Sequence, residues 1–156
     1  MYIRKGIAME KMKLLLVDDE MRFLTTTQKL LRKHGYDALI ASSGPEALEM
    51  LEKNIIHVVI LDVKMPGMDG IQTLREIKSR FPLVEVVMLT GHATVESAVD
   101  GLKSGATDYL MKPTSMEELI QKAEGAFLRW KLMEDKIQQA TGGRYRTPED
   151  AAKEDG

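Results

Sequence analysis

The sequence predicts an α/β protein with a doubly wound, five-stranded parallel sheet. Five short runs rich in Val, Ile, Leu or Ala have the length and composition of buried strands, and they lie at residues 14–17, 38–41, 58–61, 84–89 and 109–111. Amphipathic helical patterns separate these runs. Strands that alternate with helices favour a parallel sheet with helices on both of its faces.

The expected helices have recognisable starts and ends. The first ends at Gly35, the third at Phe81-Pro82, and the fourth, residues 94–104, at Gly105. Capping patterns open the second, third and fifth helices, with the residue pairs Ser43 and Glu46, Asp69 and Gln72, and Ser115 and Glu118.

Composition excludes several classes of function. The chain has 156 residues, a net charge of −2 and no cysteine, which excludes disulfides, thiolate metal sites and cysteine nucleophiles. No apolar run approaches the roughly 20 residues that span a bilayer, and the stretch Ile7-Ala8-Met9 is too short for a signal peptide. These features predict a cytoplasmic protein with no membrane partner and no direct nucleic-acid partner.

The chain divides into an N-terminal extension at 1–11, a main domain at 12–128, a helix extension at 129–140 and a disordered tail at 141–156. The last helix has an apolar stripe with heptad spacing, formed by Met116, Leu119, Ala123, Ala126, Trp130, Met133 and Ile137. The stripe fits one long helix that covers the sheet and has an exposed end. It also fits an extension that packs on a partner, and a homodimer through this helix is therefore one of the expectations.

Polar residues follow four of the five predicted strands. They are Asp18, Asp19 and Glu20 after the first strand, Asp62 after the third, Thr90 after the fourth and Lys112 after the fifth. In an open parallel sheet these positions converge on one edge, where ligands bind.

This combination suits phosphoryl transfer. Three close carboxylates cannot all stay ionised without a counter-charge, and Lys112 supplies only one positive charge. Oxygen ligands with room for water suit Mg²⁺. A carboxylate beside a metal ion, a lysine and a hydroxyl can act as a nucleophile and form an aspartyl phosphate. Taken alone, the acidic triplet would fit the solvated start of a helix equally well.

Four stretches resemble the receiver domains of two-component response regulators. They are LLVDDE at 15–20, LDVKMPGMDG at 61–70, MLTGH at 88–92 and GATDYLMKP at 105–113. The resemblance covers about residues 12–128, and within this range the chain is similar to receivers of nitrogen-regulation-type transcriptional activators. It implies the flavodoxin-like strand order 2-1-3-4-5.

The resemblance also implies a role for each matching position. Asp62 is the expected phosphoacceptor. Mg²⁺ is the expected cofactor, and its ligands are Asp18, Asp19, Asp62 and the backbone carbonyl of Lys64. Thr90 and Lys112 are expected to bind the phosphoryl group, Thr90 and Tyr109 to act as the switch pair, and Pro113 to follow a cis peptide bond. Tyr109 fits a core position equally well.

Two residues depart from the family pattern. Gly91 stands where many receivers have alanine, which should leave the acceptor more open to small donors and water. His92 follows it and is expected to influence the lifetime of the phosphoryl group.

The implied partners are a sensor histidine kinase or phosphotransfer protein, and a downstream protein target or a missing output domain. Only 28 residues follow Leu128, so the chain is expected to be either a stand-alone regulator or a fragment of a longer one. The resemblance implies that the chain accepts and loses its own phosphoryl group without acting on an outside substrate.

Three rival functions fit the residues less well. A phosphatase with an aspartate nucleophile would need a second aspartate where Lys64 stands. A flavin carrier would need a phosphate loop in place of the Asp18-Asp19-Glu20 triplet, which would repel phosphate. A pure interaction module would leave the strand-end residues unexplained.

Overall fold

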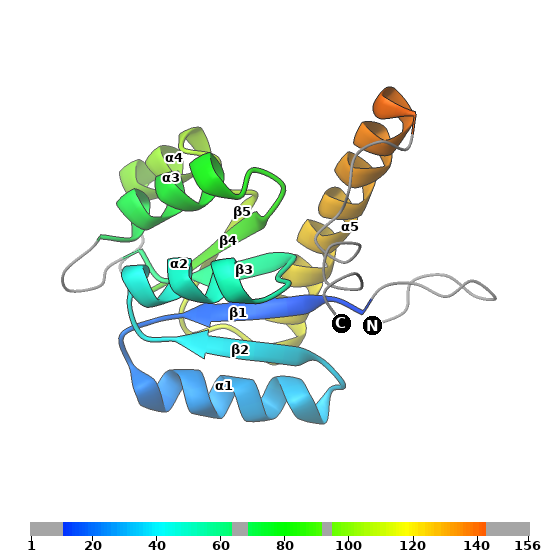
Figure 1. Cartoon of the computed structure of the whole chain (residues 1–156). Coiled ribbons are helices and arrows are strands. Elements are labelled where there is room, and N and C mark those ends of the chain that lie inside the picture. Colours follow the sequence, from blue (N-terminus) through cyan, green and yellow to red (C-terminus); the bar gives the residue numbers. More distant parts are fainter. Residues whose placement is uncertain (1–10, 64–68, 92–94, 143–156) are drawn as a thin grey trace.

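The computed structural model describes residues 11–63, 69–91 and 95–142, in which strands and helices alternate (Figure 1). The strands are β1 Lys13–Val17, β2 Asp37–Ala41, β3 Val58–Leu61, β4 Glu85–Thr90 and β5 Asp108–Met111. The helices are α1 Met21–Lys33, α2 Gly44–Lys53, α3 Gly70–Arg80, α4 Val95–Lys103 and α5 Met116–Thr141. All five predicted strands are confirmed to within two residues at each end.

The strands form one parallel sheet in the order β2-β1-β3-β4-β5, as the resemblance implies. The central strands carry almost only apolar side chains; in β1, Leu15 pairs with Leu39 of β2 and with Val59 of β3. Because successive side chains point to opposite faces, each of these strands contributes to two separate cores.

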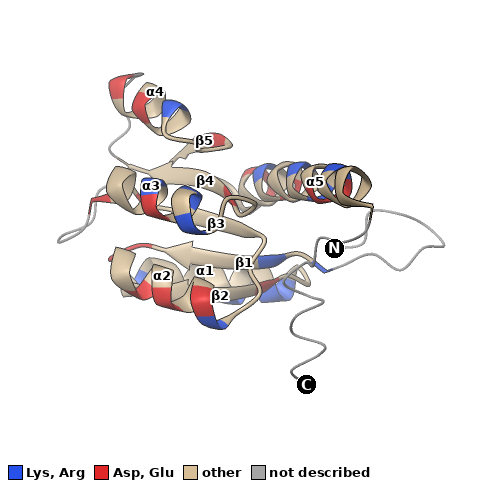
Figure 2. Ribbon diagram, turned by 45° about the horizontal axis from the view of Figure 1, so that its top comes forward, with Lys and Arg blue, Asp and Glu red and all other residues tan. Residues whose placement is uncertain are grey.

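One core lies between the sheet and helices α1 and α5, and the other lies between the sheet and helices α2 and α3. Leu14 and Leu16 enter the first core, whereas Leu15 and Val17 enter the second. Figure 2 shows charged residues mainly on the helices and near the strand ends, with few of them along the strands. The doubly wound architecture is therefore confirmed.

The predicted helix ends are largely confirmed. Gly35 and Gly105 have positive φ values of 86° and 109°, as residues that end helices in the left-handed region do. The hydroxyl of Ser115 accepts a hydrogen bond from the backbone N–H of Glu118 at 3.1 Å. In the described part of the chain the Glu118 carboxylate accepts a hydrogen bond from the Thr114 hydroxyl and not from the Ser115 N–H, so only one half of this capping box forms. Residue 94, the predicted start of the fourth helix, lies outside the described residues.

Helix α5 has 26 residues and projects beyond the sheet (Figure 1), so the expected extension of the last helix is confirmed. Most of its heptad stripe is used inside the domain. Leu119, Ala123, Ala126 and Trp130 are all buried in the first core. Met133 is 39% exposed and Ile137 is half-buried, so the stripe becomes accessible only after Trp130.

The ring of Trp130 lies 4.4 Å from that of His57 and packs with Phe127. Within the described ranges, no helix is both long enough and apolar enough to cross a membrane.

Candidate functional site

The sheet itself positions the candidate residues. Its hydrogen-bond ladder continues one residue beyond three strands. The backbone N–H of Asp18 donates to Ala41, that of Asp62 donates to Val17 at 2.9 Å, and that of Lys112 donates to Thr90 at 3.0 Å. The first residue after β1, β3 and β5 is therefore held as firmly as the strands are, at their common carboxyl edge.

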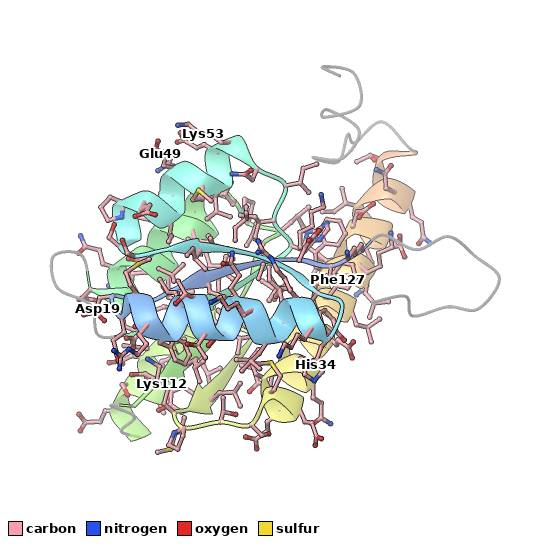
Figure 3. All side chains as sticks on the ribbon, turned by 90° about the horizontal axis from the view of Figure 1, so that it is seen from below. Asp19, His34, Glu49, Lys53, Lys112 and Phe127 are labelled. Atoms are coloured by element: carbon pink, nitrogen blue, oxygen red, sulfur yellow. The ribbon has the colours of Figure 1, made fainter. Side chains whose placement is uncertain are left out.

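The Lys112 ammonium lies at the centre of this edge. It donates a hydrogen bond to Asp18, and its Nζ lies 3.6 Å from a carboxylate oxygen of Glu20 and 4.0 Å from one of Asp62. Asp18 is 2% exposed and Asp62 is 6% exposed. Figure 3 shows Lys112 and Asp19 at the same end of the molecule, away from Phe127 and His34.

The acidic triplet after β1 can offer several oxygen ligands together. One carboxylate oxygen from each of Asp18, Asp19 and Glu20 lies within 4.8 Å of the others. Asp18 is buried, whereas Asp19 and Glu20 are exposed to solvent. Carboxylate oxygens that are partly open to water are the donors that suit a hard divalent cation. The Asp18 side chain is oriented by the backbone N–H of Glu20, which donates to it at 2.9 Å.

The electrostatics show an excess of negative charge. Burial raises the pKa of Asp18, and the charge of Asp62 adds to this, while hydrogen bonds from Lys112 and from the Glu20 N–H oppose it. Burial also lowers the pKa of Lys112, but the hydrogen bond and charge of Asp18 and the charges of Asp62 and Glu20 outweigh burial and raise it. The site therefore favours a fully charged lysine and would gain from further positive charge.

Gly70 holds the candidate acceptor from the side of α3. Its N–H donates to the carbonyl of Val63 at 2.7 Å, and a Cβ atom at residue 70 would lie only 2.3 Å from the Val63 Cα atom and 2.5 Å from the carbonyl oxygen of Asp62. A side chain cannot fit there without moving the backbone that carries Asp62. Asp69 caps the same helix by accepting hydrogen bonds from the N–H groups of Ile71 and Gln72.

The other predicted site residues have different settings. Thr90 ends β4 and is fully buried. Tyr109 packs against the second core, and among the described residues its buried hydroxyl has no hydrogen-bond partner. The peptide bond between Lys112 and Pro113 is cis, as the resemblance implies. Lys64 lies outside the described residues, and so does His92.

Sequence reasoning missed one neighbour of the site. The Lys112 Nζ lies 4.2 Å from the centroid of the Phe23 ring, over its face. Phe23 lies in the first turn of α1, which begins directly after the acidic triplet, so the start of this helix places it at the same edge. That position was the available signal.

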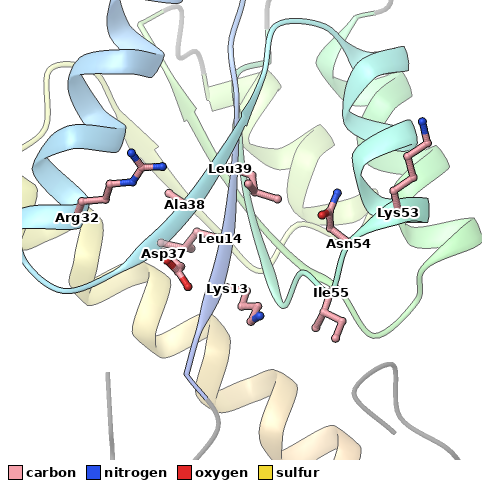
Figure 4. Close-up of a pocket in the computed structure, with 9 residues that line it drawn as sticks. All are labelled: Lys13, Leu14, Arg32, Asp37, Ala38, Leu39, Lys53, Asn54 and Ile55. Atoms are coloured by element: carbon pink, nitrogen blue, oxygen red, sulfur yellow. The ribbon is translucent and has the colours of Figure 1, made fainter. Parts of the chain in front are cut away.

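A hollow of about 410 Å³ lies at the opposite end of β1 and β2 (Figure 4). Basic, acidic and apolar residues line it, including Lys13, Arg32, Lys53 and Asp37, and none of the strand-end candidates takes part. Arg32 and Lys53 lie in the last turns of α1 and α2, where basic side chains complement the helix dipole. We assign this hollow no role.

Comparison with known protein families shows which family contains this arrangement of strand-end residues. Residues 14–124 match the family described as the response regulator receiver domain. The chain belongs to this family. The four motif stretches of this receiver domain all lie within the matched range, and each includes a residue of the Lys112 cluster or of its hydrogen-bond ladder.

Curated relatives are longer proteins. The receiver is 43% identical over 113 residues to the transcriptional regulatory protein ZraR of Escherichia coli K12, covering 72% of this chain and 26% of the relative. It is 37% identical over 108 residues to a putative NtrX-like response regulator of Rickettsia bellii, covering 68% of this chain and 23% of the relative. The chain thus spans about a quarter of the length of these two relatives.

Solved structures agree with the fold. A response regulator receiver domain from Clostridium thermocellum is 40% identical with a TM-score of 0.74, covering 78% of this chain and 98% of that one. NtrX from Brucella abortus is 31% identical with a TM-score of 0.77, covering 83% of this chain and 30% of that one. Receiver domains of this kind are parts of two-component signalling proteins, and this receiver is consistent with regulation by phosphorylation.

Proposed function

We propose that this receiver is a phosphorylation switch in which Asp62 accepts a phosphoryl group from a sensor histidine kinase or phosphotransfer protein. One observation carries the proposal: Asp62 is a buried carboxylate held at the carboxyl edge, 4.0 Å from the Lys112 ammonium and beside the acidic triplet. The cytoplasm, where phosphoryl donors derived from ATP are found, is its expected compartment.

The residues present fit a Mg²⁺ ion. Asp19 would bind it directly, Asp18 directly or through water, and Asp62 and the Lys64 carbonyl would complete the protein ligands. The support is the set of three carboxylate oxygens within 4.8 Å of one another and the excess negative charge around Lys112. When bound, Mg²⁺ would neutralise charge on the transferring phosphoryl oxygens.

The chain's own residues would carry out the transfer. A carboxylate oxygen of Asp62 attacks the phosphorus of the donor's phosphohistidine, the new O–P bond forms as the P–N bond breaks, and the histidine nitrogen leaves with the electron pair. Lys112 then pairs with the phosphoryl oxygens and Thr90 donates its hydroxyl to one of them. Attack by water on the aspartyl phosphate returns the free carboxylate and releases inorganic phosphate.

The output would come from the face formed by α4, β5 and α5. Pairing of Thr90 and Lys112 with the phosphoryl group would bias this face between two arrangements, with Thr90 and Tyr109 as the switch pair. These three elements carry exposed apolar side chains that a downstream protein target or an output domain could contact: Val99, Leu102, Met111 and Leu128. Because the receiver would accept and lose only its own phosphoryl group, we expect it to act as a switch and not as an enzyme of outside substrates.

A homodimer through α5 remains part of the proposal in a narrower form. The buried half of the heptad stripe is unavailable, so the contact would use Met133 and Ile137 together with the exposed Leu132. Replacement of Leu132 by lysine should then shift the sedimentation coefficient to that of a monomer. A wild-type protein that sediments as a monomer at all concentrations contradicts the dimer.

The test of the acceptor is intact mass after incubation with a small phosphodonor and Mg²⁺. We expect the wild type to gain one phosphoryl group, Asp62→Asn to gain none, and a chelator to abolish the gain. Asp100→Asn is the matched control, because Asp100 is an exposed aspartate of α4. Equal modification of the wild type and Asp62→Asn would refute the assignment, and no modification by any donor would favour an interaction module.

A further inference from the structure

A half-buried aromatic ring lies beneath the site lysine. Phe23 is in the first turn of α1 and packs against the core between the sheet, α1 and α5. The Lys112 Nζ lies 4.2 Å from its ring centroid, well within the range in which a cation is attracted to the face of an aromatic ring. The two residues come from opposite ends of the domain sequence and meet only in the folded protein.

The ring differs in kind from the other neighbours of the ammonium. Asp18, Glu20 and Asp62 all offer it negative charge, and Asp18 holds it by a hydrogen bond. The face of a phenyl ring attracts a cation through its quadrupole without carrying a formal charge. It therefore restrains the ammonium without neutralising the charge that Lys112 would bring to a phosphoryl group.

Restraint matters for this side chain. Lysine is a flexible four-carbon chain that loses substantial rotamer freedom when it is fixed. During modification of Asp62 the ammonium would exchange its hydrogen bond to Asp18 for one to the phosphoryl oxygens. A neutral ring that remains beside the ammonium can hold it near Asp62 during that exchange, whereas an additional carboxylate would compete for it.

We propose that Phe23 is a positioning residue that holds the Lys112 ammonium beside Asp62 through a cation–π contact. This inference rests on the proposed function, because the reaction it assists is the modification of Asp62. Contacts of this kind, at partly buried sites, correspond to about 2- to 30-fold in a rate or equilibrium constant. That range is the expected effect of removing the contact.

The test is a graded fluorination series at position 23. One, two and three fluorine atoms on the ring progressively weaken the negative potential of its face while changing its shape little. We expect the logarithm of the Asp62 phosphorylation rate, measured with a small phosphodonor and Mg²⁺, to fall stepwise along the series. The Phe23→Leu variant should be phosphorylated more slowly than the wild type, whereas Phe23→Trp, which keeps an aromatic ring, should retain the wild-type phosphorylation rate.

The matched control is the same series at Phe81. That ring also faces a cation, with the Arg80 guanidinium carbon 5.5 Å from its centroid, but it lies at the end of α3 far from the strand-end residues. The Phe81 series should leave the rate unchanged. A flat Phe23 series in a protein that is phosphorylated overturns this inference alone, whereas no phosphorylation of the wild type overturns the proposed function with it.

A second readout needs neither metal nor phosphodonor. In the presence of a chelator, the three-fluorine form of Phe23 should have an equilibrium constant for folding about 2- to 30-fold lower than that of the wild type when Lys112 is present. In the Lys112→Met background the same fluorination should have no effect, because the cation is gone. An equal effect in both backgrounds means that the ring contributes only packing, and it refutes the positioning role.

Discussion

Replacing Lys112 by methionine tests the electrostatic description of the site most directly. Methionine keeps most of the apolar stem of lysine but removes the only cation found within 4.0 Å of Asp18 and Asp62 in the described part of the chain. With an effective dielectric constant of about 20, the attraction between charges 4.0 Å apart is about 4 kcal/mol. Loss of one partner from a buried pair costs a similar amount, because the other charge stays buried.

Proton uptake by Asp18 sets an upper limit on this cost. From the ordinary pKa of 3.8, neutralising this carboxyl costs about 4 kcal/mol at pH 7 and about 1.6 kcal/mol at pH 5. A carboxyl whose pKa is raised in the folded state loses stability as the pH rises from its unfolded value through its folded value. The deficit of Lys112→Met should therefore be up to about 4 kcal/mol at pH 7 and should shrink to below about 2 kcal/mol at pH 5.

Urea unfolding of the metal-free protein at pH 5 and pH 7 measures these values. Lys122→Met is the matched control, because Lys122 pairs with Asp108 at 2.9 Å near the surface, where such pairs contribute less than about 1 kcal/mol. If Lys112→Met loses no more stability than Lys122→Met, or if its deficit is the same at both pH values, Lys112 is not the counter-charge of the buried carboxylates.

Three further predictions concern other parts of the chain. Gly70→Ala should destabilise the domain by about 1–3 kcal/mol and slow phosphorylation, because the new Cβ would overlap the backbone beside the acceptor. The control Gly125→Ala, in an open part of α5, should instead stabilise the domain by up to about 1 kcal/mol. Urea unfolding measures both changes, and changes of the same sign would contradict this prediction. Burial, together with the hydrogen bond to Glu124 and the charge of Glu124, raises the pKa of Tyr36 to about 12. The contribution of the neutral Tyr36 to stability is therefore complete below pH 10 and falls by about 1.4 kcal/mol by pH 11. Tyr36→Phe should remove this part of the pH dependence, and an unchanged slope of stability against pH between pH 9 and 11 would refute the assignment. Gly91→Ala places a methyl group 3.9 Å from the Cβ of Lys112 without strain. It should slow both phosphorylation by small donors and dephosphorylation, which are measured by the gain and the decay of the phosphorylated mass. Unchanged rates would show that this position does not control access to the acceptor.

The fold could be predicted from the sequence because its local signals agree with one another. Apolar runs such as residues 58–61 are too short for helices and too apolar for exposed loops, and glycines at 35 and 105 end helices where a positive φ is needed. The parallel order then places every strand end at one edge. Consequently the sequence alone groups Asp18, Asp62 and Lys112, since their convergence follows from the topology of the sheet.

Only the tertiary structure shows which side chains of one element are covered by another element. The heptad stripe of α5 predicts an apolar face, but only packing against the sheet shows that this face is buried as far as Trp130 and exposed at Met133. Periodicity defines a face of a helix and does not identify the surface that covers it.

The same reason explains why Phe23 was missed and Lys112 was not. A charged residue at a strand end is unusual enough to stand out in a sequence, whereas a phenylalanine on an amphipathic helix has the composition of an ordinary core residue. Its place beside the ammonium depends on how α1 packs against the sheet and on how far the Lys112 side chain reaches from the end of β5, at a distance of 4.2 Å that only the folded chain determines. The sequence by itself determined which groups reach the carboxyl edge, and the packing of helices on the sheet decided which neutral side chains surround them.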